Sequence, residues 1–188
     1  MNGRRTCSAG KITDAAALLE MHIPGLQRFA RALLRGDRDR ADDLVQDTLE
    51  RALSSWRRRR EGDLRGWLYT ILYHRFVADW NRQKRRSTSD ALAEIVEDQP
   101  RGVAGGQDYA LEYRDLLRAF ATLPTEQRAV LSLITVEDLS YEAAARVLGV
   151  PVGTVMSQLS RGRERLRRLT GRETDQNFRQ GVVPARTT

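Results

Sequence analysis

Apolar residues recur at intervals of three and four positions along most of this sequence, and strict alternation of apolar with polar residues is nowhere sustained. The first pattern places apolar side chains along one face of an α-helix, whereas the second is typical of a β-strand. Leu, Ala, Arg and Glu, which all tolerate or favour helices, dominate the same segments. We therefore expect an all-α protein.

A stretch of different chemistry, residues 87–108, interrupts the helical pattern. It contains Pro100, three glycines and few large apolar residues, and five acidic residues against one arginine give it a net charge of −4. This composition is typical of a linker. We expect two small helical domains, the N-terminal part (14–86) and the C-terminal part (109–170), joined by this flexible acidic linker and followed by a tail, 171–188.

Local signals predict where the helices begin and end. Asp63 is a suitable N-cap, Pro124 a suitable opening residue, and Gly149 can adopt the positive φ that ends a helix. The expected helical spans are 14–36 with an interruption at Pro24, 41–56, 64–86, 108–122, 124–134, 141–148 and about 153–169.

Composition excludes several classes of protein. No run of about 18 apolar residues exists to span a membrane, and no apolar stretch follows the basic N-terminus to form a secretory signal. Cys7 is the single cysteine, and His22 and His74 are far apart, so neither a disulfide scaffold nor a zinc finger fits. We expect a soluble cytoplasmic protein without a metal or cofactor. Its net charge of +7 makes a polyanion the first partner to consider.

The C-terminal part contains the pattern of a helix-turn-helix: a short helix, a turn with Gly149 and a longer helix. The longer helix has an apolar face that includes Val155 and Leu159. Its opposite face carries side chains suited to base edges and phosphates: Thr154, Ser157, Gln158, Arg161 and Arg165. The alternative is an ordinary solvated face of an amphipathic helix, but the complete turn signal before it favours DNA binding.

The helix expected at 41–56 carries a polar cluster away from its apolar stripe, formed by Asp43, Gln46, Asp47 and Glu50. This cluster is compatible with docking onto a basic protein surface, with a metal for phosphodiester chemistry, or with a simple solvated face. No histidine or further acidic motif nearby completes a nuclease site, which disfavours the metal.

The helix expected at 64–86 carries one aromatic stripe, Tyr69, Tyr73, Phe76 and Trp80. Basic residues flank or interleave it: Arg57, Arg58, Arg59, Arg60, Arg75, Arg82, Lys84, Arg85 and Arg86. One interpretation is that all these rings belong to the core of a bundle. The other is a platform on which unpaired bases stack beside a groove for phosphates. We expect part of the stripe to serve each purpose.

Three segments in this order resemble the extracytoplasmic-function (ECF) sigma factors of bacterial RNA polymerase. They are DDLVQDTLERAL (42–53), RGWLYTIL (65–72) followed by NRQKRR (81–86), and the C-terminal segment 123–169. The resemblance covers about 14–170 and implies a subunit that addresses the polymerase to promoters without catalysing a reaction itself. It also implies control by an anti-sigma factor.

The resemblance implies a role for each surface. Asp43, Gln46, Asp47 and Glu50 would dock onto the clamp helices of the largest polymerase subunit. The loop from Arg57 and the helix after it, with Arg58, Arg59, Arg60, Tyr69, Tyr73, Trp80, Arg82 and Arg85, would capture the non-template strand of the minus-ten element. The last helix would read the minus-thirty-five element as double-stranded DNA.

The chain departs from the common family pattern at Met156, Gln158 and His74, so the promoter sequence it reads cannot be carried over. Two alternatives are a stand-alone helix-turn-helix regulator, which binds its operator without polymerase, and a DNA-processing enzyme that uses the carboxylate cluster.

Overall fold

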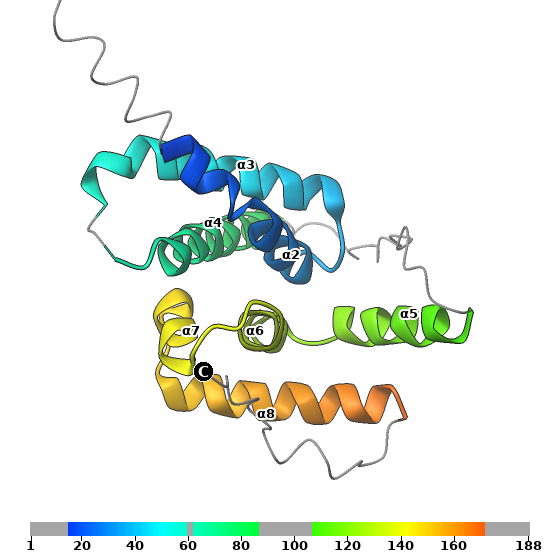
Figure 1. Cartoon of the computed structure of the whole chain (residues 1–188). Coiled ribbons are helices and arrows are strands. Elements are labelled where there is room, and N and C mark those ends of the chain that lie inside the picture. Colours follow the sequence, from blue (N-terminus) through cyan, green and yellow to red (C-terminus); the bar gives the residue numbers. More distant parts are fainter. Residues whose placement is uncertain (1–14, 60–61, 87–106, 172–188) are drawn as a thin grey trace, which may run out of the picture.

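The computed structural model describes residues 15–59, 62–86 and 107–171, and every regular element within these ranges is a helix (Figure 1). The expected linker lies outside the described residues except for positions 107 and 108, which begin a helix. Of the expected tail, only Gly171 is described. None of the described helices is both long and apolar enough to cross a bilayer. The all-α prediction is confirmed.

The N-terminal part is a bundle of three long helices, preceded by a short helical segment at 15–20. The elements are α2 (Ile23–Leu33), α3 (Arg38–Ser55), the 3-10 turn η1 (Trp56–Arg58) and α4 (Leu64–Arg86). Pro24 opens α2, and the Asp63 carboxylate accepts a hydrogen bond of 2.8 Å from the Gly66 N–H, as an N-cap of α4 does. These boundaries follow the sequence signals because caps act locally.

The C-terminal part contains the expected helix-turn-helix. Its elements are α5 (Gln107–Ala121), α6 (Thr125–Leu131), η2 (Ser132–Val136), α7 (Tyr141–Leu148) and α8 (Val152–Leu169). The Ser140 hydroxyl accepts a hydrogen bond of 3.1 Å from the Ala143 N–H at the start of α7. Gly149 ends α7 with a φ of 66°, a conformation that glycine adopts without strain.

The helix expected at 124–134 does not continue regularly to its end. From Ser132 it widens into a π-helical turn, η2, in which the Glu137 N–H donates to the Ser132 carbonyl oxygen at 3.0 Å. Asp138, which follows, has a positive φ of 49°, uncommon for a residue other than glycine. Single π-helical turns are frequent at functional sites. Here the π turn η2 directly precedes Glu137.

The two parts pack against each other. Figure 1 shows α2, α3 and α4 as one layer above α6, α7 and α8, with α7 against α4 and α6 against α2. A single core cluster includes Phe29 and Leu72 of the N-terminal part and Leu133 and Val147 of the C-terminal part. The structure is therefore a closed arrangement, in which each part covers one face of the other.

Candidate functional site

The polar cluster of α3 lies at the surface, as its pattern predicts. Asp43, Gln46 and Glu50 are exposed and Asp47 is half-buried. The Gln46 side chain donates a hydrogen bond of 3.2 Å to Glu50, and Arg75 of α4 forms an ion pair with Asp47. The cluster remains a continuous polar surface, and Arg75 neutralises one of its carboxylates.

A shallow cavity of about 190 Å³ adjoins this cluster, between α3 and the second half of α4. Asp43 and Asp47 line one side, and Asp79 and Trp80 the other. The acidic cluster and the aromatic stripe are therefore neighbours in space. In the part of the chain that the structure describes, no three Asp, Glu, His or Cys side chains lie close enough together to hold a metal ion.

The aromatic stripe of α4 is divided between core and surface. Tyr69 is 2% exposed and Phe76 is 4% exposed, whereas Trp80 is 48% exposed and Tyr73 is half-buried. The rings of Phe76 and Trp80 stack with centroids 6.2 Å apart, so the core holds Trp80 in place from one side. Trp80 presents the largest exposed ring of the stripe, whereas Tyr69 is covered in this arrangement.

Basic side chains lie near both ends of α4. Arg57 and Arg58 are exposed, and the Arg59 guanidinium lies over the Trp56 ring, 5.1 Å from its centroid. Arg82 is exposed and forms an ion pair of 3.4 Å with Asp79, one turn earlier. Arg60 and the side chain of Arg85 lie outside the described residues.

The second helix of the helix-turn-helix, α8, is fixed by its apolar face. Val155 is fully buried and Leu159 is 3% exposed. At Gly162 a Cβ atom would lie 2.8 Å from Leu131 of α6, so the two helices meet closely there. Leu169, at the end of the helix, is 51% exposed.

The opposite face of α8 is accessible along its length. Arg161 and Arg165 are exposed, whereas Thr154, Ser157 and Gln158 are half-buried. The Ser157 hydroxyl donates a hydrogen bond of 2.9 Å to the Thr154 carbonyl oxygen within the helix. The arrangement suits a helix whose polar side chains enter a DNA groove while the apolar face stays on its support.

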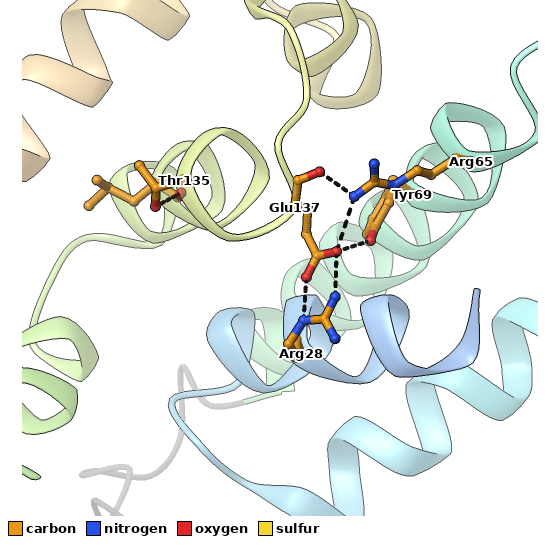
Figure 2. Close-up of polar contacts among 6 residues, drawn as sticks. Arg28, Arg65, Tyr69, Thr135 and Glu137 are labelled. Carbon is orange, nitrogen blue, oxygen red and sulfur yellow. Dashed lines mark hydrogen bonds and ion pairs between the residues drawn. The ribbon is translucent and has the colours of Figure 1, made fainter. Parts of the chain in front are cut away.

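A polar network that sequence reasoning missed joins the two parts (Figure 2). The Glu137 carboxylate, only 1% exposed, accepts hydrogen bonds from Arg28 Nε at 2.8 Å and Arg28 Nη2 at 3.0 Å. It also accepts from the Tyr69 hydroxyl at 2.6 Å and from Arg65 Nη2 at 3.3 Å. A second bond joins Arg65 to the Glu137 backbone carbonyl oxygen.

The network changes the pKa values of its members, and the small residue Gly25 leaves space for it. Burial and the hydrogen bond to Glu137 raise the pKa of Tyr69, so its hydroxyl keeps its proton. The same carboxylate raises the pKa of Arg28. Gly25 of α2 leaves room, because a Cβ there would lie 2.5 Å from the Tyr69 hydroxyl and 2.9 Å from a Glu137 oxygen. No sequence signal connects these residues, since Arg28 and Glu137 are 109 positions apart.

Two family models match the chain. Residues 113–166 match the model described as Sigma-70, region 4, and residues 19–73 match the model described as the Sigma2 domain of PhyR. The chain is 40% identical over 148 residues to the ECF RNA polymerase sigma factor EcfG of Rhodopseudomonas palustris (strain TIE-1), which covers 77% of this chain and 78% of that protein.

Two solved structures have a similar fold. The sigma factor RpoE of Bartonella quintana, crystallised with the anti-sigma factor NepR, superposes with a TM-score of 0.76 at 34% identity, covering 86% of this chain and 99% of that one. CnrH, solved with the cytosolic domain of CnrY, superposes with a TM-score of 0.60 at 24% identity, covering 85% and 88%, and so shows the shared fold.

The two matched models together place the chain among the sigma factors, which are regulatory proteins. More narrowly, the chain belongs to the ECF RNA polymerase sigma factors. Its partners in transcription are therefore RNA polymerase and promoter DNA.

Proposed function

We propose that three surfaces of this chain divide the work of promoter recognition. The acidic cluster of α3 binds the clamp helices of the largest polymerase subunit, α4 with the loop before it captures the non-template strand of the minus-ten element, and α8 reads the minus-thirty-five element. The residues are Asp43, Gln46, Asp47 and Glu50 for polymerase; Arg57, Arg58, Arg59, Arg60, Tyr69, Tyr73, Trp80, Arg82 and Arg85 for the single strand; and Thr154, Ser157, Gln158, Arg161 and Arg165 for the duplex.

The observation that carries this proposal is the outward polar face of α8. Arg161 and Arg165 are exposed while Val155 and Leu159 anchor the helix to the core. A guanidinium at such a position grips guanine O6 and N7 in the major groove, and Gln158 is suited to adenine. The exposed Trp80 ring supports the second assignment, because base–aromatic stacking needs an uncovered ring.

The proposed domains are 14–86 and 109–170, joined by the linker 87–108 and followed by the tail 171–188. Two domains on one tether bind two promoter elements and one enzyme surface together, so weak contacts gain from effective concentration. Melting is favoured because bases stack on the protein only after they leave the duplex. The chemistry of chain elongation belongs to the polymerase, and the chain acts where that polymerase works, in the cytoplasm.

An anti-sigma factor is the proposed regulator. The RpoE structure was solved with the anti-sigma factor NepR, and the CnrH structure with the cytosolic domain of CnrY. A partner that binds both parts of this chain would hold the closed arrangement and keep α4 and α8 from reaching one promoter together.

Electrophoretic mobility shifts on a promoter library, with and without core polymerase, test the proposed function. We expect sequence-specific complexes that require core polymerase. A stand-alone helix-turn-helix regulator would instead bind its operator tightly without polymerase, commonly as a dimer on a palindrome. Tight, specific binding by the chain alone would therefore contradict the proposal.

A further inference from the structure

Three side chains of the N-terminal part bind the Glu137 carboxylate of the C-terminal part. Arg28 of α2 grips both carboxylate oxygens, and Arg65 and the Tyr69 hydroxyl of α4 converge on the second oxygen (Figure 2). A forked arginine with further donors recognises a phosphate as readily as a carboxylate, because both present adjacent anionic oxygens. The donors belong to one part of the chain and the anion to the other.

We propose that Arg28, Arg65 and Tyr69 form a binding site for a phosphodiester of the DNA backbone, and that Glu137 is an internal competitor for it. In the closed arrangement the carboxylate fills the site. When the two parts separate on a promoter, a backbone phosphate takes its place. This inference rests on the proposed function, because it assumes that both promoter elements are bound together.

The spacing of the two promoter elements requires the N-terminal and C-terminal parts to separate. The minus-ten and minus-thirty-five elements lie about 25 base pairs apart, which at about 3.4 Å per pair is roughly 85 Å. A compact chain of this length has a radius of gyration of only about 16 Å. The closed arrangement therefore cannot place α4 and α8 on the two elements at once. Opening removes Glu137 and leaves two cations without their shared partner.

The site is prepared for another occupant. The side chains of Arg28 and Arg65 are already 51% and 41% exposed, so an incoming phosphate reaches them from solvent. Gly25 keeps free the space that the carboxylate oxygen now fills. Tyr69 and Trp80 lie on the same helix, about 16 Å apart at 1.5 Å per residue, so one DNA strand can contact both.

The simpler alternative is that the network only holds the two parts together. Binding of the full chain to a fluorescent single-stranded oligonucleotide, measured by anisotropy, separates the two interpretations. Glu137→Gln weakens the competitor, and we expect about three- to tenfold tighter binding. Adding Arg28→Ala and Arg65→Ala to Glu137→Gln should abolish that gain. If the network is only a clasp, this triple variant is equally open and keeps the gain, which would overturn the phosphate site.

Matched controls make the result specific. Glu137→Gln with Arg118→Ala removes an exposed cation of α5 instead and should keep the gain. Glu137→Gln with Tyr69→Phe, which retains the ring, should lose part of it. An oligonucleotide with neutral methylphosphonates should show no difference between Glu137→Gln and the wild-type chain. Absence of any gain in Glu137→Gln on the normal oligonucleotide would also overturn the proposal.

Failure of the proposed function is distinguishable from failure of this site. If the variants show the expected pattern on the oligonucleotide but the chain forms no core-dependent promoter complex, the phosphate site is supported and the proposed function is contradicted. If the chain forms such complexes but the triple variant still binds the oligonucleotide more tightly than the wild-type chain, only the phosphate site is contradicted.

Discussion

The guanidinium of Arg128 in α6 donates a hydrogen bond of 2.8 Å to the carbonyl oxygen of Leu33, 95 positions earlier at the end of α2. Its Nε reaches the neighbouring carbonyl oxygen of Ala32 at 2.9 Å. The last carbonyl groups of a helix lack intrahelical partners and carry partial negative charge, so they stabilise a cation there. Burial lowers the pKa of Arg128 to about 10, which still leaves it charged at neutral pH.

Arg128→Ala should destabilise the closed arrangement by about 3 kcal/mol, because it leaves a cavity and several buried carbonyl oxygens without a donor. Denaturant unfolding of the full chain measures the change. Arg118→Ala, which removes an exposed arginine of α5, is the matched control and should change stability by less than about 0.5 kcal/mol. Equal effects of the two substitutions would show that Arg128 does not hold the parts together.

The boundaries of the helices could be predicted from the sequence, whereas the contacts between residues far apart in the sequence could not. The cap of α4 at Asp63 and the end of α7 at Gly149 were predictable because caps and turns depend on a few adjacent residues. The pairing of Glu137 with Arg28 was not, because it spans 109 positions and depends on a π turn. Periodicity likewise grouped Tyr69 with Trp80 but did not indicate that the C-terminal part covers Tyr69.

Charge reversal in the acidic cluster should abolish copurification with core polymerase. Asp43→Arg with Glu50→Arg is the sharpest change, because both residues are exposed and Asp47 keeps its ion pair with Arg75. The expected cause is repulsion from a basic partner surface. Asp115→Arg, at an exposed position of α5, is the control and should copurify normally. Undiminished binding by the double variant would place the polymerase contact elsewhere.

Arg161→Ala should weaken binding of the polymerase complex to the minus-thirty-five element by about 1–3 kcal/mol, and only at one base position. Competition assays with single-base variants of that element measure this. Arg168→Ala, near the end of α8, should instead weaken binding to all sequences alike, as loss of a phosphate contact does. A uniform loss for Arg161→Ala would make it a phosphate contact too.

Trp80→Ala should reduce affinity for single-stranded minus-ten DNA by about 1–3 kcal/mol, because one base loses its stacking partner. Its stability should change little, since the ring is 48% exposed. Phe76→Ala, one turn earlier and 4% exposed, should instead cost about 3–5 kcal/mol of stability. Binding to forked and fully paired promoter DNA, compared by anisotropy, separates the effects. Equal losses on both DNAs would contradict capture of an unpaired base by Trp80.

We infer that this chain selects the promoter, while core polymerase catalyses RNA synthesis. Run-off transcription by purified core enzyme on a promoter library, with and without the chain, tests it most directly. We predict defined start sites that appear only when the chain is present and that shift or vanish with Arg161→Ala. Identical transcripts with and without the chain on every template would contradict this division of roles.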